Sequence, residues 1–188
     1  MNPSKINEYH GVHQNLNEKD AIALLIKCGC SRDVIEHSKT VAEYARDIAK
    51  SIINNAKKKG HSINIDMDVV FLGGLLHDIG RSKTHGIDHA VAGAAIALQN
   101  GFGEKVVNII ERHIGAGITM EEAAVLGLPK KDYLPVTVEE KIVAHADNLV
   151  FGSRIGTLDE LVLSLRKKRL DEKVIQRIIK LNKGSAPR

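Results

Sequence analysis

Residues 67–78, MDVVFLGGLLHD, form a segment that is apolar on nearly every side before it ends in a histidine and an aspartate. A helix over these residues has no face that prefers water, and such a helix belongs in the middle of a bundle. The segment therefore predicts a helical bundle that buries it. It also places two costly polar groups, His77 and Asp78, at a buried helix end.

Apolar residues recur at helical spacing along most of the chain, whereas strand signals are missing: the sequence has no sustained alternation and no Asn-Gly or Asp-Gly hairpin between alternating segments. Residues 61–66 resemble a strand, but the segment is too short to predict one. We expect an all-α fold in which Gly80 takes the left-handed conformation that ends the central helix. The predicted helices span residues 18–28, 32–58, 67–78, 88–99, 104–113, 119–126, 138–151, 159–169 and 171–182.

The chain has 188 residues, which suits one domain with a sizeable core. We expect a flexible arm over residues 1–15, a helical domain over 16–183 and a disordered tail over 184–188. The metal-site core would occupy about residues 30–150, with C-terminal helices over 159–182. No apolar run approaches the ~20 residues of a membrane span, and no signal peptide is recognisable, so a cytoplasmic location is expected.

The composition narrows the functional classes. Aromatic residues make up only 3% of the chain, which argues against base-stacking platforms for RNA. The net charge of +4 mildly favours anionic ligands such as phosphates. Cys28 and Cys30 are the only cysteines, so the chain lacks the second pair that a cysteine zinc site needs. We interpret them as buried or half-buried thiols.

Several polar residues lie on predicted core-facing stripes, where an unpaired charge costs several kcal/mol. His37 falls within the apolar stripe of the 32–58 helix, and Asp147 falls on an apolar face of the 138–151 helix. His89 and His113 occupy comparable positions on two other helices. A lone inward histidine is more often a hydrogen-bonded core residue than a ligand. That interpretation, however, must supply a separate partner for each of these groups.

Imidazole and carboxylate together form a ligand set for first-row divalent metals. His89 lies in the first turn of its helix, where the dipole disfavours protonation and so favours the neutral form that binds metal. His113 lies near a helix end whose dipole favours the cation, which makes it the less certain ligand. His145 points to nearly the opposite face from Asp147 and is interpreted as structural.

In order and spacing, these residues resemble the H…HD…D motif of the HD superfamily of metal-dependent phosphohydrolases. The motif is found as His37 in VIEHSKTVAEYA, as His77-Asp78 in GLLHDIGR and as Asp147 in AHADNLV. The resemblance covers about residues 30–150. It implies an all-helical bundle in which His37, His77, Asp78 and Asp147 coordinate a metal.

Some members of that superfamily hold two metals, bridged by the aspartate of the HD pair. The segments HAVAGA and ERHIGAG resemble the elements that supply the additional ligands, which points to His89 and His113 as second-metal candidates. His85, four residues before His89, competes for the same role. Residues 111–150 also resemble an uncharacterised, largely archaeal subgroup of small HD proteins, which implies no substrate.

The sequence departs from the superfamily's common pattern at the residue after the His-Asp-Ile-Gly motif, residues 77–80, where lysine is often found. Here it is Arg81, which keeps the charge but presents a planar fork to phosphate. The glycine-tyrosine-proline element of cyclic-di-GMP phosphodiesterases is absent, and so is a nucleotidyltransferase domain. The resemblance therefore implies a reaction class without selecting a substrate.

We expect a metal-dependent phosphohydrolase that uses one or two divalent ions (Mn, Fe, Ni, Co, Mg or Zn) on a small phosphorylated molecule, a nucleotide or dinucleotide. Asp78 would hold the metals and accept a proton, and Arg81 would assist catalysis. Arg81, Lys83 and Arg112 are the candidates for contacting phosphate, although a solvated surface role fits them about as well. No membrane partner is expected, and the oligomeric state is open.

Two alternatives from other classes stay open. The chain could be a regulatory module that binds a metal or nucleotide without turnover. It could also be an RNA-associated accessory protein that binds through the basic stretch 165–180, LRKKRLDEKVIQRIIK. The apolar residues within that stretch favour packing, and a charge run is more often a solvated helix face.

Overall fold

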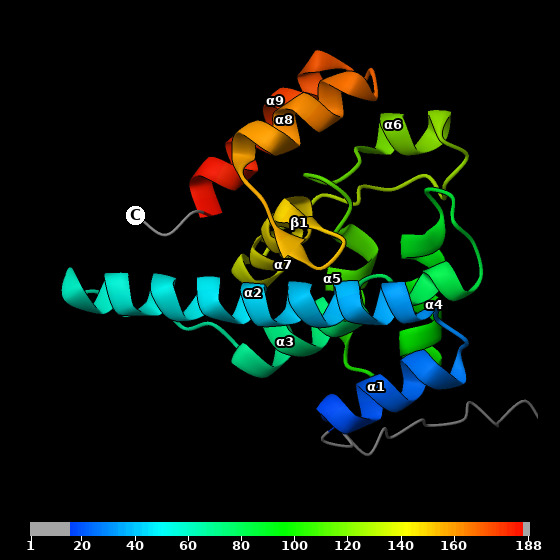
Figure 1. Ribbon diagram of the computed structural model, residues 1–188, viewed down its shortest axis with the longest axis horizontal. Coiled ribbons are helices and arrows are strands. Elements are labelled where there is room, and N and C mark those ends of the chain that lie inside the picture. The colour runs from blue at the N-terminus through cyan, green and yellow to red at the C-terminus, as the bar shows by residue number, and fades with distance from the viewer. Residues whose placement is uncertain (1–15, 186–188) are drawn as a thin grey trace, which may run out of the picture.

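The computed structural model of the chain describes residues 16–185, and these form a helical bundle with one short hairpin (Figure 1). The all-α fold class is confirmed. The predicted arm over residues 1–15 and the last three residues of the predicted tail lie outside the described part. The elements are α1 (Glu18–Lys27), α2 (Arg32–Lys58), α3 (Met67–Leu76), the 3-10 helix η1 (Ile79–Ser82), α4 (His89–Gln99), α5 (Glu104–Arg112), α6 (Met120–Val125), α7 (Val138–Leu149), β1 (Val150–Phe151), β2 (Arg154–Ile155), α8 (Leu158–Lys167) and α9 (Glu172–Ser185).

Helix α3 lies at the centre of the bundle, as its all-apolar sequence predicts. It packs against α1, α2, α5 and α7. Its start is fixed by Asp66, whose carboxylate accepts a hydrogen bond from the Val69 amide. Residues 73–78 are all buried, so the C-terminal end of α3 lies in the interior of the molecule.

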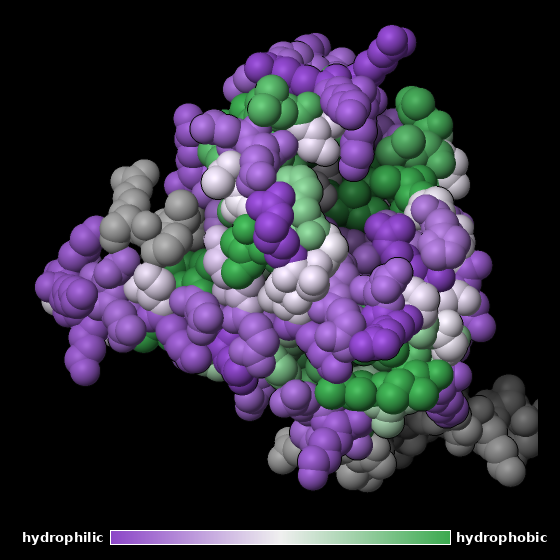
Figure 2. Space-filling view, viewed as in Figure 1, coloured by the Kyte–Doolittle hydropathy of each residue, from purple (hydrophilic) through white to green (hydrophobic). Residues whose placement is uncertain are grey.

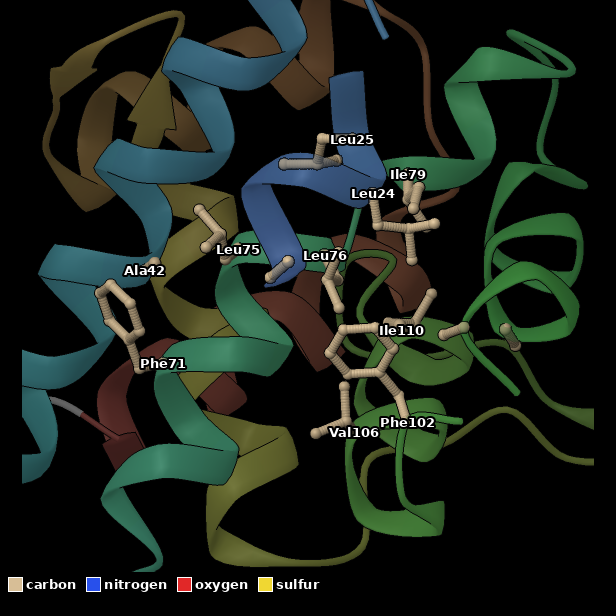
Figure 3. Close-up of a cluster of buried hydrophobic side chains, with 13 residues drawn as sticks. Leu24, Leu25, Ala42, Phe71, Leu75, Leu76, Ile79, Phe102, Val106 and Ile110 are labelled. Carbon is tan, nitrogen blue, oxygen red and sulfur yellow. The ribbon is translucent and has the colours of Figure 1, made fainter. Parts of the chain in front are cut away.

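The largest apolar cluster joins the N-terminal helices to α4 and α5 (Figure 3). It contains Leu25, Leu75, Leu76, Ile79 and Ile110, each no more than 1% exposed. A second cluster lies between α2, α3 and α7, and a third joins α7 to α8 and α9. Cys28 and Cys30 are half-buried thiols that pack against the first cluster, as expected.

The C-terminal part of the predicted 138–151 helix is wrong. Helix α7 ends at Leu149, and Val150–Phe151 pairs with Arg154–Ile155 as an antiparallel hairpin. The connection is the two-residue loop Gly152-Ser153, with Gly152 at φ +65°. Gly-Ser between two strands is a hairpin signal, but strands of only two residues leave no alternating pattern in the sequence.

The predicted role of Gly80 is also wrong. Gly80 lies within η1 and is not among the glycines with positive φ. A Cβ at this position would lie 1.8 Å from the His89 carbonyl oxygen and 2.6 Å from the Gly93 amide nitrogen. The glycine is therefore required by the close approach of two backbones, and this approach holds the start of α4 against the end of α3.

The Gly80→Ala variant should be destabilised by about 3 kcal/mol or more, at or beyond the upper end of typical overpacking costs, because the contacted atoms are backbone. Equilibrium urea unfolding measures the effect. Gly184→Ala is the matched control, since a Cβ there meets nothing within 4 Å. An equally small change in both variants would contradict the close-approach interpretation.

Helix α8 ends in a backbone arrangement that normally uses glycine. Arg169 has φ 56°, its amide bonds to the Arg166 carbonyl, and the Leu170 amide bonds to the Leu165 carbonyl. This is the Schellman pattern, with arginine in the left-handed position. A non-glycine residue in that conformation costs roughly 1–2 kcal/mol. The chain therefore keeps an arginine where it is locally unfavourable.

The Arg169→Gly variant should raise the free energy of unfolding by about 1 kcal/mol through relief of this strain. Arg169→Ala is the matched control, because it removes the same charge while retaining a Cβ at φ 56°. Urea unfolding of the two variants makes the comparison. Equal stability of the glycine and alanine variants would show that the conformation is not strained.

At the C-terminus, α9 continues through Ser185 instead of ending near residue 182, so residues 184 and 185 are helical and not part of a disordered tail. Within residues 16–185, no helix is both long and apolar enough to cross a membrane.

Candidate metal centre

Six side chains that the sequence singled out come together at the centre of the bundle. Helix ends position three of them, because His77 is the C-cap of α3, His113 is the C-cap of α5 and His89 opens α4. The others are His37 on α2, Asp78 after α3, and Asp147 on α7. Five helices therefore contribute to one cluster.

One half of the cluster is built around Asp147. Its Oδ1 atom lies 3.0 Å from His37 Nε2 and 3.3 Å from His77 Nε2. Donor atoms of these three residues all lie within 4.8 Å of one another, so a single cation could contact them all. The side chains of His37 and Asp147 are 17% and 22% exposed, whereas His77 is fully buried. This half is therefore the side from which solvent reaches the cluster.

The other half is built around Asp78. Its Oδ1 atom lies 3.2 Å from His89 Nε2 and 3.6 Å from His113 Nε2, while its Oδ2 atom lies 3.7 Å from His77 Nε2. The two carboxylate oxygens thus face different histidines. This is the arrangement that a bridging ligand between two cations would need.

All four histidine rings are oriented by backbone carbonyl groups. Nδ1 of His77, His89 and His113 each lies 2.7 Å from the carbonyl oxygen three residues earlier in the chain. His77 and His113 use the free carbonyls that every helix leaves at its C-terminal end. Nδ1 of His37 lies 2.8 Å from the Gly152 carbonyl oxygen. Because a carbonyl only accepts, each Nδ1 must carry the proton.

The neutral form of each ring then turns a bare Nε2 lone pair towards the cluster. His89 Nε2 and His113 Nε2 lie 3.2 Å apart, and two lone pairs at that distance repel unless a proton or a cation lies between them. His77 Nε2 and Asp78 Oδ1 are buried without a hydrogen-bond partner. Metal-binding histidines typically donate the other ring nitrogen to a carbonyl or carboxylate. The donor set therefore fits one or two divalent cations.

The pKa directions show how strongly the cluster favours cations. Burial lowers the pKa of His77, but the carboxylates of Asp78 and Asp147 outweigh it and raise the pKa to about 9. Burial raises the pKa of both carboxyl groups, but the neighbouring His77 and other histidines hold each well below its ordinary value. The two carboxylates thus stay charged near neutral pH.

For His113, burial dominates and lowers the pKa of the imidazole. The helix end that the sequence analysis expected to favour the cation is outweighed by the loss of water around a fully buried ring. His113 is therefore held neutral, which is the form that can bind a metal. The preference for the charged ring, which made His113 the less certain ligand, is therefore outweighed by burial.

The three cations proposed for phosphate lie in different environments. Arg81 Nε donates to Asp78 Oδ2 at 2.7 Å, so Arg81 borders the cluster directly. Lys83 is exposed just after η1. Arg112 forms an ion pair with both carboxylate oxygens of Glu140, which is 3% exposed. This buried partner gives Arg112 a structural role that the sequence analysis did not foresee.

Two further histidines contribute little to the cluster. His85 is exposed and makes none of the cluster contacts found among residues 16–185, whereas His89 is buried inside the cluster. His145 is buried beside Tyr44, away from the cluster, and burial lowers the pKa of its ring. The fold thus places His89 in the cluster and leaves His85 and His145 outside it.

The hairpin is the part of the site that the sequence analysis missed. The loop between β1 and β2 supplies the Gly152 carbonyl that orients His37, 115 residues away in the chain. Every residue has a backbone carbonyl, so side-chain patterns cannot identify the one that orients His37. The Gly-Ser dipeptide, which favours a turn, is the signal in the sequence that indicates this loop.

Comparison with known proteins agrees with the geometry. The HD domain family matches residues 34–152. An uncharacterised protein of Methanocaldococcus jannaschii is 54% identical over 84% of this chain and 90% of its own length. A tRNA (cytidine(56)-2'-O)-methyltransferase of Thermoplasma volcanium is 46% identical over 89% of this chain, but only 46% of that enzyme is covered.

A ribonuclease Y of Acidothermus cellulolyticus is 30% identical over 69% of this chain and 24% of its own length. Among solved structures, the HD domain of the Listeria monocytogenes phosphodiesterase PgpH is similar over 86% of this chain and 94% of its own, at 18% identity and a TM-score of 0.48. The match over residues 34–152 contains all six side chains of the cluster, and the chain belongs to the HD domain family.

Proposed function

We propose that this protein is a metal-dependent phosphohydrolase that cleaves a phosphoester or phosphoanhydride bond in a nucleotide-containing substrate. The observation that carries the proposal is the convergence of four imidazole Nε2 atoms and two ionised carboxylates, with every Nδ1 fixed by a carbonyl oxygen. Such a donor set has no evident purpose without a cation. HD family membership supports phosphate chemistry at that cation.

The donors divide into two groups. His37, His77 and Asp147 would hold one ion, and His89 and His113 would hold a second, with Asp78 between them. When bound, a divalent metal polarises phosphoryl oxygens and lowers the pKa of water towards ~7. The two carboxylate oxygens of Asp78 face different histidines, and those histidines hold its pKa below the ordinary range, so the group stays ionised. We therefore assign Asp78 to holding metal, with accepting a proton from water as its second role.

Arg81 is the cation best placed for substrate phosphate. Its Nε is bound to Asp78, and no second ion pair of Arg81 is found among residues 16–185. Its two Nη groups are thus left to donate to a phosphate oxygen beside the metals. Lys83, exposed on the same turn, would add positive charge at the approach, whereas Arg112 is neutralised by Glu140.

The nucleotide part of the proposal is supported by the relatives. The names of the methyltransferase and ribonuclease relatives refer to RNA. A phosphodiester of RNA, or a nucleotide derived from it, is therefore our preferred substrate class. The same names support the second candidate, an accessory module that binds RNA without hydrolysis.

The test is a hydrolysis assay of the purified chain loaded separately with Mn²⁺, Fe²⁺, Co²⁺, Ni²⁺ or Mg²⁺. Substrates are bis(p-nitrophenyl) phosphate, nucleoside phosphates and short RNA, with products resolved by chromatography. Turnover that disappears in a His77→Ala, Asp78→Ala variant is the expected result. Inactivity with every metal, combined with RNA binding that weakens steeply with salt, would favour the accessory module instead.

A further inference from the structure

A cleft of about 810 Å³ opens beside the metal centre, between α6 on one side and α8 and α9 on the other. Figure 2 shows hydrophobic side chains around this hollow, below the hydrophilic end of α8 and α9. Cavities that hold small organic ligands typically measure ~300–1,000 Å³. Helices α8 and α9 lie outside residues 34–152, the part of the chain that matches the HD family.

The walls of the cleft are mainly aliphatic, and its mouth exposes apolar side chains to water. Val125 is 88% exposed, and Leu126 and Leu170 are 47% and 36% exposed. Isolated exposed apolar side chains are ordinary, but three on the rim of one cavity indicate a surface that gains stability when an organic group covers it.

The cleft is continuous with the metal centre. Asp147 lines the cleft and also contacts His37 and His77, and it belongs to the half of the cluster that solvent reaches. Its neighbour Asn148 donates to the Gly115 carbonyl at 2.8 Å, which fixes the loop that forms the adjoining wall. A substrate whose phosphate lies at the metals would therefore extend its organic part into this cleft.

The charges along the cleft are unevenly distributed. Arg177 donates to Glu122 at 2.7 Å and to the Gly117 carbonyl, so that cation is already neutralised. Glu121, on the α6 side, is exposed and repels anions. Lys168 lines the opposite side, and no ion pair of Lys168 is found in the described part of the chain. A second anionic group on a ligand would be drawn to the α8–α9 turn.

Arg169 adds to the charge on that turn. It follows Lys168 directly, is exposed, and is the one described non-glycine residue with a positive φ. Arg169 lies between the lining residues Lys168 and Leu170 without lining the cleft itself, and backbone strain retained beside a cleft is typical of functional positions. A glycine would relieve the strain but would remove the cation, so the arginine is explained if its guanidinium binds an anion.

We infer that this cleft holds the nucleoside of a nucleotide that carries a second phosphate, with one phosphate at the metal centre and the other on Lys168 and Arg169. This inference rests on the proposed function. It selects a nucleoside bisphosphate or an oligonucleotide over a simple mononucleotide. The apolar walls cover the nucleoside, and the turn between α8 and α9 selects the additional phosphate.

The test is calorimetric binding to the Mn²⁺-loaded chain, with thymidine 5'-monophosphate and thymidine 3',5'-bisphosphate as probes. The bisphosphate should bind at least about tenfold more tightly, as expected for an added charge-assisted contact. A Lys168→Gln, Arg169→Gly variant should bring the two affinities within about twofold of each other, without weakening the monophosphate. Lys57→Gln, Lys58→Gln, on the exposed end of α2, is the matched charge control.

A second pair of variants tests the cleft itself. Ser164 lines the cleft, whereas its neighbour Leu163 lies outside it and is 68% exposed. Ser164→Phe should weaken both probes by about tenfold or more by filling the cleft, and Leu163→Phe should weaken neither. Equal affinity of the native chain for the two probes, or unaltered binding by Ser164→Phe, would overturn the inference.

The outcomes separate this inference from the proposed function. Chromatography of each binding mixture shows whether a probe was hydrolysed. The predicted binding pattern without hydrolysis of any substrate would contradict the phosphohydrolase and leave the cleft assignment standing. Hydrolysis that Ser164→Phe and the Lys168, Arg169 variant leave unaltered, with unchanged binding, would contradict the cleft assignment alone.

Discussion

The Asp78→Asn variant should bind little divalent metal and lose phosphohydrolase activity by well over about 100-fold, the upper end of the loss when an outer-shell partner of a metal ligand is removed. Asparagine keeps the shape of the side chain but removes the negative charge. Asp78 is the residue whose two oxygens face different histidines, so both halves of the cluster lose a donor at once.

Metal content after purification and the hydrolysis rate are the two measurements. His145→Gln is the matched control, because it also replaces a buried polar side chain but one that lies outside the cluster. The control should keep its metal. Metal content equal to that of the native chain in Asp78→Asn would refute a bridging position for Asp78.

Removing the metal should lower the melting temperature substantially. A metal that binds only the folded chain stabilises it by about 2.7 kcal/mol at a free concentration 100 times its Kd. For a chain of 188 residues this corresponds to a shift of about 5–11 °C. The physical reason is that coordination satisfies the facing Nε2 atoms of His89 and His113, which lie 3.2 Å apart, together with the buried carboxylates.

The measurement is a thermal melt after dialysis against a chelator, repeated as Mn²⁺ is added back. The Asp78→Asn variant should show little of the Mn²⁺-dependent rise, and His145→Gln should show all of it. A melting temperature that does not respond to Mn²⁺, Fe²⁺ or Zn²⁺ would contradict a metal site in this cluster, whatever the enzyme assays show.

The helices were predictable because each depends on neighbours in the chain. The all-apolar 67–78 segment was predicted as a central helix, and α3 is enclosed by α1, α2, α5 and α7. The errors lie where tertiary contacts outweigh local preference. Residues 150 and 151 are not helical, because they pair with residues 154 and 155. Gly80 does not adopt a left-handed turn, and it is required because the backbone of α4 lies against it.

The candidate ligands were predictable because buried charges are costly enough to be conspicuous in an apolar pattern. The fold brings together all six polar residues that the apolar pattern makes conspicuous: His37, His77, Asp78, His89, His113 and Asp147. Arg112 shows the limit of that reasoning. Its proposed phosphate contact could not be weighed against Glu140, because nothing in the sequence showed that the two side chains meet.

By itself, the sequence determined the helical fold class and which imidazole and carboxylate groups face the core, since residue type and helical spacing are local properties of the chain. Only the tertiary structure decided how that chemistry is organised. It brought the Gly152 carbonyl to His37, divided the two oxygens of Asp78 between different histidines, and opened an apolar cleft beside Asp147. These features join residues up to 115 positions apart, and such contacts exist only once the chain has folded.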